Sequence, residues 1–280
     1  MHFFKYHGTG NDFIIIDDFA KKTENRKSVA RHLCHRRFGI GADGCLFLEK
    51  SKGVDSSMLI FNADGSEAEM CGNGIRCVGK YLYEKRQTEK KEMSIKTKAG
   101  IREISLTLKN GKVESVRVDM GAPHFQREKI PALGHGLFLK EKMSVAGETL
   151  EVSALNTGVP HAVVFVKDIQ KVPVVGWGRT IGNDGVFPEG ANVNFVEHVG
   201  KNLFRVRTYE RGVGDETWTC GTGVTASSVV AAVLGMADSS EPIKIRTQGG
   251  ELSVTVDMKG GKVEKAYMSG PAQFVFEGDV

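Results

Sequence analysis

Apolar residues recur along the chain in two arrangements, which predict many short strands and a few helices. Short runs that are rich in β-branched and aromatic residues and bounded by Gly, Asn or Asp predict strands. These runs lie at residues 13–16, 45–48, 58–61, 93–97, 102–108 and 112–119. Helical spacing predicts helices over residues 26–36, 74–85 and 223–235. The last of these is apolar on every side, so we expect it to be buried all round.

Several segments of the first half reappear in the second at a nearly constant offset of about 150 residues. The matched pairs are residues 9–16 with 157–164, 46–49 with 194–197, 59–62 with 207–210, 97–100 with 247–250, and 111–114 with 261–264. A period this long with only two copies indicates a tandem duplication and not a solenoid. Lys109-Asn110-Gly111-Lys112 predicts a type I′ hairpin turn, which Lys259-Gly260-Gly261-Lys262 repeats.

The predicted fold class is α+β, with two pseudo-symmetric domains that are each a curved, barrel-like antiparallel β-sheet wrapped round a central helix. We expect an N-terminal domain of residues 1–120 together with 271–280, and a C-terminal domain of residues 121–270. Residues 127–142 are more polar and are predicted to form a surface insertion. Residues 273–277 have no counterpart in the first copy. We predict that they return to pair with the N-terminal domain, with pairing inside the second domain as the alternative.

Composition indicates an ordinary soluble globular chain of 280 residues, 40% apolar and 26% charged. The net charge of +4 suits an acidic small substrate but is too weak and dispersed to predict nucleic-acid binding. No apolar run is long enough for a membrane span, and the N-terminus lacks the composition of a secretory or transit peptide. Five cysteines, an odd number, favour a reducing cytoplasm over a disulfide framework. We predict no metal site, because no two ligand pairs have zinc spacing.

Two cysteines occupy equivalent places in the two copies. Cys-Gly-Asn-Gly at residues 71–74 and Cys-Gly-Thr-Gly at residues 220–223 each precede an apolar helical segment. The N–H groups and positive end of a helix favour a thiolate and can hold an anion beside it. Most free cysteines are simply small buried apolar residues. The repetition of the whole motif nevertheless favours a shared chemical role.

Three kinds of chemistry suit two thiols in like surroundings. A redox dithiol usually has its cysteines close in sequence and in unequal environments. A nucleophile needs one thiol and a base, and leaves the second cysteine unexplained. A two-base proton exchanger explains the likeness, because one thiolate removes a proton from one face of a carbon and the other thiol supplies one to the opposite face. Backbone N–H groups at Gly72-Asn73 and Gly221-Thr222 could hold the substrate carboxylate and replace a metal or imine cofactor.

Further motifs, in the same order, make the chain resemble the diaminopimelate epimerases through almost its whole length. The motifs are Asn11-Asp12-Phe13, Asn62-Ala63-Asp64-Gly65-Ser66, Cys71-Gly72-Asn73-Gly74-Ile75-Arg76-Cys77, Phe187-Pro188-Glu189-Gly190-Ala191-Asn192-Val193, and Glu210-Arg211-Gly212 with Cys220-Gly221-Thr222-Gly223. The resemblance implies a cofactor-independent, homodimeric isomerase of the cytoplasm. Such an enzyme inverts one α-carbon of LL-2,6-diaminopimelate to the meso form, which feeds lysine and peptidoglycan synthesis. Its implied partner is a small dicarboxylic diamino acid, with no membrane or nucleic acid.

The resemblance also implies a role for each matching residue. Cys71 and Cys220 match the catalytic base and acid, and His161 and Glu210 match residues that poise the thiols. The matching substrate-binding positions are Asn11, Asn62, Gly72, Asn73, Asn192, Glu210, Arg211, Gly221 and Thr222. Arg211 can bind a carboxylate bidentately, which suits a dicarboxylic substrate. Turn chemistry is the alternative for the asparagines, and a surface ion pair is the alternative for Glu210 and Arg211.

Two positions depart from the pattern of the family. Gly44 follows Asp43 where many members have Gln, and Gly158-Val159-Pro160-His161 stands where many have Gly-Asn-Pro-His. Both family residues bind substrate. We therefore expect looser recognition of the distal end of the substrate, because Val159 cannot form the hydrogen bonds of an asparagine.

Two other functions remain as alternatives. A cofactor-independent proline or hydroxyproline racemase would also use two cysteines, but Arg211 and the asparagines indicate a substrate with a second charged end. A non-catalytic redox protein could instead join Cys71 and Cys220 in a reversible disulfide. Catalysis by the reduced protein would separate these functions.

Overall fold

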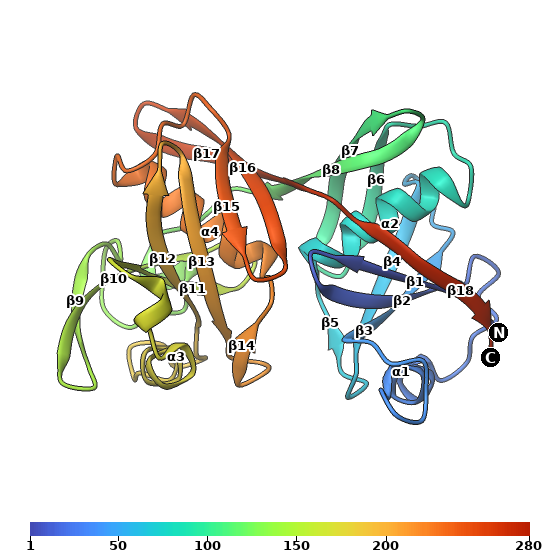
Figure 1. Ribbon diagram of the computed structural model, residues 1–280, viewed down its shortest axis with the longest axis horizontal. Coiled ribbons are helices and arrows are strands. Elements are labelled where there is room, and N and C mark those ends of the chain that lie inside the picture. Colours follow the sequence, from blue (N-terminus) through green and yellow to red (C-terminus); the bar gives the residue numbers. More distant parts are fainter. The chain divides into compact units, whose positions relative to one another are not determined.

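The structure, a computed structural model, describes all residues from Met1 to Val280 (Figure 1). The chain divides into two compact units: unit 1 consists of Met1–Asp119 and Ser269–Val280, and unit 2 of Met120–Met268. We propose these units as the two copies of the duplicated domain.

Unit 1 is made of two helices and a set of mostly short strands. Its elements are β1 (His2–Gly8), β2 (Asn11–Asp17), α1 (Arg26–Cys34), β3 (Gly44–Glu49), β4 (Ser56–Asn62), β5 (Glu67–Ala68), α2 (Gly72–Glu84), β6 (Glu92–Thr97), β7 (Gly100–Lys109), β8 (Lys112–Gly121) and β18 (Gln273–Asp279).

Unit 2 repeats this order after two short additions. Its elements are η1 (Arg127–Lys129), β9 (Glu141–Val145), β10 (Glu148–Asn156), β11 (Pro160–Val166), η2 (Ile169–Lys171), α3 (Val174–Gly182), β12 (Asn192–Gly200), β13 (Leu203–Glu210), β14 (Asp215–Thr217), α4 (Gly221–Val233), β15 (Ile243–Thr247), β16 (Gly250–Lys259) and β17 (Lys262–Gly270). The series from β11 to β17 reproduces the series from β2 to β8, with α3 and α4 in the places of α1 and α2. This agreement is what a tandem duplication predicts.

The predicted type I′ turns are confirmed at the two equivalent hairpins. Asn110 and Gly111 have φ of 51° and 74°, and Gly260 and Gly261 have φ of 57° and 77°. Two consecutive residues with positive φ define this turn, and its twist matches that of the strands that it joins.

The sheet of each unit is mixed and not purely antiparallel. In unit 1, β2 pairs with β3 and β4 pairs with β6 in parallel, while β1–β2, β3–β4, β6–β7 and β7–β8 are antiparallel. In unit 2, β11–β12 and β13–β15 are the parallel pairs. Parallel neighbours need a long crossover, and in each case a helix supplies it. The sequence predicted helices, but it did not show which strands before and after them pair in parallel.

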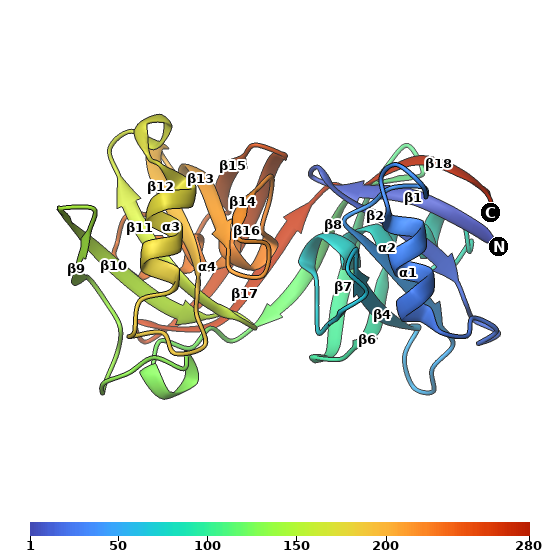
Figure 2. The ribbon, with the colours of Figure 1, turned by 90° about the horizontal axis from the view of Figure 1, so that it is seen from below.

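The two helices of unit 1 pack on opposite faces of its sheet. Cys45 and Phe47 of β3 belong to a buried cluster with residues of α1, whereas Leu46 lies within contact of Gly74 in α2. Alternate side chains of β3 are therefore buried on both faces, which explains the continuous apolar run from Cys45 to Leu48. In unit 2, α3 lies across β12 and β13 (Figure 2).

Helix α4 is buried nearly all round, as its sequence predicts. All of its residues are buried except Thr222 and Val233. Thr225, Ser227 and Ser228 donate hydrogen bonds to the carbonyl groups of Gly221, Gly223 and Val224, four residues earlier. Because these hydroxyls are satisfied within the helix, they can be buried without a large penalty.

Helix α3 was not predicted from the sequence, because three glycines make it a poor helix by propensity. The structure shows why Gly178 occurs there. A Cβ at this position would lie 2.4 Å from Cβ of Tyr209, so glycine allows the helix to approach β13 closely. Tertiary packing therefore outweighs local preference in this segment.

The prediction of a surface insertion at residues 127–142 is wrong in part. Ile130 and Phe138 are fully buried and belong to the main hydrophobic cluster of unit 2. Arg127 is also buried, and its guanidinium stacks on the Phe138 ring at 4.3 Å. Charged residues make up the two ends of the segment, but apolar side chains between them attach it to the core.

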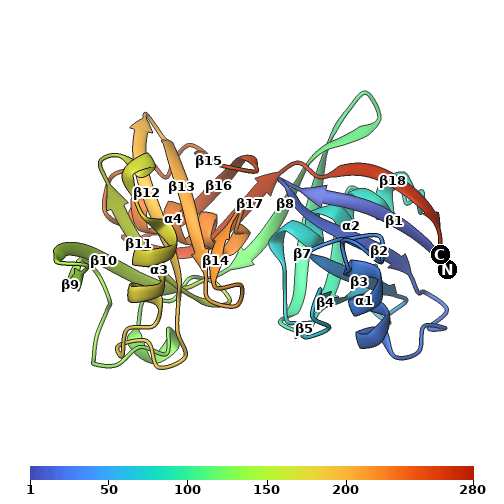
Figure 3. The same ribbon diagram turned by 60° about the horizontal axis from the view of Figure 1, so that its bottom comes forward.

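The final strand returns to the N-terminal unit, as predicted. β18 pairs antiparallel with β1, with Phe4 opposite Glu277, and the two run side by side (Figure 3). The backbone N–H of Val280 donates to the carbonyl of Met1 at 3.0 Å, so both ends of the chain lie together in unit 1. None of the helices is long and apolar enough to cross a membrane.

Candidate active site

In unit 1, strand pairing gathers the predicted site residues at one edge of the sheet. Phe13 lies opposite Gly44, and Gly44 lies opposite Asn62. Asn11 at the start of β2 and Asn62 at the end of β4 therefore belong to the same edge. Helix α2 begins beside Asn11, because Cys71 and Asn73 both hydrogen-bond to the Asn11 side chain.

Cys71 is the N-cap of α2, with an extended backbone (φ −140°, ψ 115°). Its Sγ accepts a hydrogen bond from the Gly74 N–H at 3.4 Å and donates to Asn11 Oδ1 at 3.8 Å. The first contact stabilises the thiolate and the second stabilises the thiol. Cys71 is partly exposed, so it is accessible to a small molecule.

Arg76 is a member of this site that sequence analysis did not single out. It is fully buried and donates to the Gly72 carbonyl, Asn73 Oδ1 and Thr9 Oγ1, at 3.0 to 3.2 Å. Burial lowers the pKa of Arg76 to about 10, so the side chain is still a cation at neutral pH. A charged residue between the apolar positions Ile75 and Cys77 was the available signal.

The other predicted residues of unit 1 lie in different surroundings, some at the start of α2 and one in an exposed turn. Gly72 is the first residue of α2, and Asn73 is buried beside it. Asn62 is exposed, and its Nδ2 donates to Ser66 Oγ at 2.9 Å across the turn that joins β4 and β5. In this structure the Asn62 side chain thus serves the turn, which is the alternative that the sequence left open.

Unit 2 gathers its predicted residues at the equivalent edge. His161 on β11 lies opposite Asn192 on β12, and Val193 lies opposite Tyr209, next to Glu210 at the end of β13. Helix α4 begins at the same place, since Glu210 lies against the Cys220 thiol. The two units therefore present the same construction: a row of polar residues at one sheet edge with a cysteine at a helix start.

Cys220 is the N-cap of α4 and is more deeply buried than Cys71. Burial raises the pKa of the Cys220 thiol well above its ordinary value, and the negative charge of Glu210 raises it further. Hydrogen bonds from the Thr222 hydroxyl, 3.3 Å from Sγ, and from the Gly223 N–H oppose this shift but do not reverse it. The sequence predicted that the helix start would favour a thiolate, but here desolvation and the neighbouring carboxylate outweigh the helix.

High thiol pKa values predict a loss of stability in alkaline solution. Burial raises the pKa of Cys34 and Cys77 to about 12, and those of Cys45 and Cys220 well above 9. The folded protein therefore keeps protons that the unfolded chain loses above about pH 8.5. The free energy of unfolding should fall with pH above that point, by about 1.4 kcal/mol per pH unit for each such thiol. Denaturant unfolding at several pH values from 8 to 11 measures the slope.

Cys45→Ala is the control for this alkaline slope, because Cys45 is buried in the unit 1 core and is not at the site. The variant should be less stable at neutral pH. Its free energy of unfolding should fall less steeply with pH, by the slope that one thiol proton contributes. An unchanged slope would show that Cys45 does not contribute to the alkaline instability.

His161 is completely buried, and burial lowers its pKa to about 3, with the charge of Arg211 as a smaller cause. It is therefore neutral at physiological pH. Its Nδ1 lies 3.1 Å from Asn194 Nδ2, which can only donate, so the proton of the ring is on Nε2. Nε2 has no hydrogen-bond partner within the protein.

Asn194 is the second residue that sequence analysis missed. It donates to the Ala162 carbonyl at 3.0 Å and accepts from Thr208 Oγ1 at 3.0 Å, in addition to its contact with His161. Its side chain also approaches the first turn of α4. A Cβ at Gly223 would lie 2.2 Å from Asn194 Oδ1, so only glycine fits there. Asn194 thus links the sheet edge to the helix that carries Cys220.

Gly223→Ala should lower the free energy of unfolding by about 2 to 3 kcal/mol, because either α4 or Asn194 must move. Denaturant unfolding measures this loss. Gly176→Ala in α3 is the matched control, since a Cβ there meets no atom within 4 Å. That substitution should be neutral or stabilising by up to about 1 kcal/mol. Equal effects of the two substitutions would contradict the steric explanation.

Arg211 and Asn192 are held together by a backbone contact. Asn192 Oδ1 accepts from the Arg211 N–H at 3.0 Å. Arg211 Nη1 donates to the carbonyl groups of Glu189 and Gly190. These bonds hold the guanidinium through Nη1 alone. The pair of N–H groups that can bind both oxygens of one carboxylate is not used by them. The Thr222 carbonyl accepts from Thr157 Oγ1, in the loop between β10 and β11, at 3.1 Å, and Gly221 opens α4.

No cluster of three or more His, Cys, Asp or Glu side chains has a geometry that could hold a metal ion. The groups at the two sheet edges are thiols, a neutral imidazole, amides and helix N–H donors. Thiols exchange protons, and helix N–H donors bind carboxylates. The chemistry that these groups support is proton transfer on an anionic small molecule.

Sequence comparison decides the family. The family described as diaminopimelate epimerase matches residues 3–126 and 153–275. The chain belongs to the diaminopimelate epimerase family. It is 47% identical to the diaminopimelate epimerase of Methanocella arvoryzae, over 100% of this chain and 96% of the relative. It is 43% identical to that of Moorella thermoacetica, over 100% and 99%. Membership makes the protein an isomerase.

Solved structures show the same fold at much lower identity. A hydroxyproline epimerase from Agrobacterium vitis has a TM-score of 0.74 at 17% identity, covering 100% of this chain and 90% of that one. A PhzF-family phenazine biosynthesis protein from Bacillus anthracis has a TM-score of 0.73 at 20% identity, covering 100% and 98%. The diaminopimelate epimerase family therefore shares its mixed α+β fold with other epimerases and with PhzF proteins.

Proposed function

We propose that this chain interconverts LL- and meso-2,6-diaminopimelate without a cofactor, with Cys71 and Cys220 as its two acid–base groups. The observation that supports this best is the equal construction of the two cysteines. Each is the N-cap of a buried helix of 13 residues that follows a polar sheet edge. In a family of epimerases, a base and an acid that exchange roles on reversal should have like surroundings.

In the proposed reaction a thiolate removes the α-proton and becomes a thiol. The electron pair is left on the α-carbon, where its carboxylate, held by helix N–H groups, disperses the charge. The second thiol then delivers its proton to the opposite face and becomes a thiolate. Because burial and Glu210 keep Cys220 protonated, we propose that Cys220 is the resting proton donor and Cys71 the resting base. The pair returns to this state by turnover in the opposite direction or by exchange with water.

The N–H groups of Gly72-Asn73 and Gly221-Thr222 are proposed to bind the reacting carboxylate. Arg211, with a bidentate edge that its own hydrogen bonds leave unused, is proposed to bind the distal carboxylate. Asn11, Asn62 and Asn192 are proposed to contact the substrate amino and carboxylate groups. Asn62 would have to exchange its bond to Ser66 for one to the substrate.

Proton exchange in deuterated buffer tests this function. Reduced protein is incubated with LL-diaminopimelate and no added cofactor, and α-deuterium is followed together with the ratio of LL to meso isomers. Deuterium should enter the meso product as it forms. Absence of both inversion and exchange would reject diaminopimelate as the substrate, and proline and hydroxyproline, with the same protein, would then test the nearest alternative.

Val159→Asn should sharpen recognition of the distal end of the substrate. An asparagine restores one hydrogen bond to a polar substrate group, which is expected to shift discrimination by about 1 to 3 kcal/mol. The measurement is the ratio of kcat/KM for diaminopimelate to that for shorter dicarboxylic amino acids. An unchanged ratio would mean that Val159 does not loosen recognition in this chain.

We also propose that the protein acts in the cytoplasm as a homodimer, as its family resemblance implies. All five cysteines are free thiols in the structure, and a reducing compartment would keep them so. Sedimentation of the reduced protein over a range of concentrations tests the assembly.

A further inference from the structure

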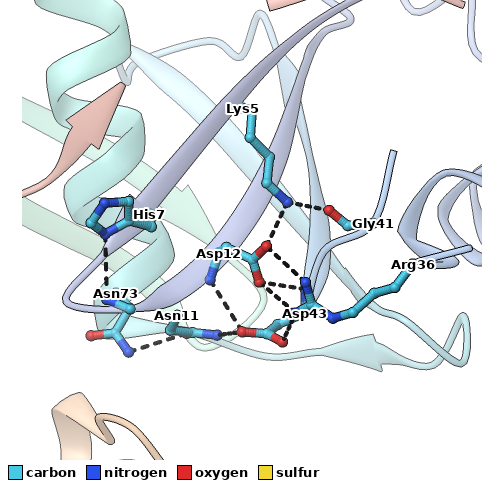
Figure 4. A network of polar contacts seen from close by, with 9 residues as sticks. Lys5, His7, Asn11, Asp12, Arg36, Gly41, Asp43 and Asn73 are labelled. Atoms are coloured by element: carbon cyan, nitrogen blue, oxygen red, sulfur yellow. Dashed lines mark hydrogen bonds and ion pairs between the residues drawn. The ribbon is translucent and has the colours of Figure 1, made fainter. Parts of the chain in front are cut away.

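A chain of side-chain hydrogen bonds runs beneath Cys71 in unit 1. Arg76 Nη1 donates to Asn73 Oδ1 at 3.0 Å, and Asn73 Nδ2 donates to Asn11 Oδ1 at 3.1 Å. Asn11 Nδ2 in turn donates to Asp43 Oδ2 at 2.7 Å (Figure 4). Asn11 Oδ1 also faces the Cys71 sulfur, 3.8 Å away.

The two ends of this chain determine its direction. A guanidinium can only donate hydrogen bonds, and a carboxylate can only accept them. Arg76 therefore forces the oxygen of Asn73 toward itself, and Asp43 forces the nitrogen of Asn11 toward itself. Neither amide can rotate by 180° without placing two donors or two acceptors together. The oxygen of Asn11 is thereby kept on the side of Cys71 and Asn73.

Asp43 is itself held in place from several sides. Its Oδ1 accepts from Arg36 Nη2 at 2.7 Å, and its Oδ2 also accepts from the Asp12 N–H at 3.1 Å. Asp12 joins the same cluster through Arg36 and the buried Lys5 (Figure 4). Burial opposes ionisation of Asp12, but the hydrogen bonds from Arg36 and Lys5 hold its pKa well below its usual range. The Asp12 carboxylate is therefore an ionised acceptor at neutral pH.

We propose that Asp43 is a positioning residue for Cys71, which it acts on by fixing the amide orientation of Asn11. This inference rests on the proposed function, in which Cys71 alternates between thiolate and thiol. The Gly74 N–H stabilises the thiolate and Asn11 Oδ1 stabilises the thiol, so both forms have a partner. Without Asp43, Asn73 alone holds the Asn11 oxygen in place, so Asn11 turns its nitrogen toward the sulfur more readily and the thiol then loses this acceptor.

The charged and titratable groups around Cys71 are few enough to name. Arg76 and Cys77 of α2 act on it by charge. Asp43, Asp12, Arg36 and Lys5 lie behind Asn11 on the other side, and His7 of β1 lies beside Asn73 (Figure 4). Removing the Asp43 charge would by itself stabilise a thiolate nearby, so the test must separate charge from orientation.

The rate of alkylation of Cys71 by iodoacetamide, followed by peptide mass spectrometry from pH 6 to 10, reports the thiolate fraction without any substrate. In Asp43→Ala, which removes the acceptor for Asn11 Nδ2, the apparent pKa of Cys71 should fall by about half a unit to one unit, the equivalent of one lost hydrogen bond. Alkylation at pH 7 should then be about three- to tenfold faster. Asn11→Ala should produce the same change, because it removes the same acceptor.

The double variant Asn11→Ala with Asp43→Ala separates the two explanations. If Asp43 acts through Asn11, the double variant should match Asn11→Ala alone. Additive shifts, or no shift in Asp43→Ala, would overturn the proposal. Asp43→Asn is the second variant at this half-exposed position: it removes the charge but keeps an oxygen that can accept from Asn11, so it should shift the profile less than Asp43→Ala. Circular dichroism verifies the fold of each protein. Epimerisation by the wild type is measured separately, so a failure of the proposed function leaves a different result from a failure of this inference.

Discussion

Cys71→Ala and Cys220→Ala are each expected to lower kcat for epimerisation by about 10²- to 10⁴-fold, the range for loss of a positioned acid–base group. Each substitution removes the proton carrier on one face of the α-carbon, so inversion cannot be completed from either isomer. The loss should appear in kcat more than in KM, because the thiols move the proton and do not bind the carboxylates. Initial rates of LL-to-meso conversion measure it.

Cys77→Ala is the matched control for the cysteine variants. Cys77 lies in the same helix as Cys71 but is completely buried in the core of unit 1. The substitution should cost some stability by leaving a small cavity and should keep most of the activity. Retention of epimerisation in either site variant, or its loss in the control, would contradict the two-cysteine mechanism.

Arg76→Met should lower the free energy of unfolding by about 3 to 5 kcal/mol. The guanidinium donates to Gly72, Asn73, Thr9 and Pro271, and all four acceptors would lose a partner in a region closed to water. The start of α2 should loosen first, since two of these acceptors belong to its first turn. Denaturant unfolding gives the loss, and hydrogen exchange locates it.

Two further variants give stability losses with which that of Arg76→Met can be compared. Arg76→Lys keeps a buried cation with three donors and should cost less than Arg76→Met. Arg86→Met removes a partly exposed guanidinium that pairs with Asp17, and should cost at most about 1 kcal/mol. A loss in Arg76→Met no greater than that in Arg86→Met would mean that the buried hydrogen bonds do not stabilise unit 1.

The periodicity of apolar side chains predicted much of the secondary structure. The alternating runs and the helical spacing predicted six strands and three helices, and the structure has a strand or helix at each place. Periodicity failed for α3, where Gly178 serves a contact with Tyr209. Nothing local to residues 174–182 reports that contact, because its partner lies on a strand that follows in the chain.

The candidate site residues likewise divide into those that the sequence predicted and those that it missed. The repeated cysteine motifs pointed to the two helix starts, because the position of a helix N-terminus is encoded locally. Arg76 and Asn194 were missed, although each links several candidate residues within its own unit. Their partners come from other elements, and a single sequence contains no sign of which elements meet.

From residue order and local preference alone, the sequence predicted six strands and three helices and pointed to the family. It also suggested the duplication and the pairing of Cys71 with Cys220, which remain proposals. The raised pKa of the Cys220 thiol, by contrast, comes from packing, since desolvation and the charge of Glu210 arise when β13 and α4 are brought together. The orientation of Asn11 was likewise decided by the meeting of β2, α2 and the segment that carries Asp43. Burial and amide direction are properties of packed neighbours, and they exist only after the chain has folded.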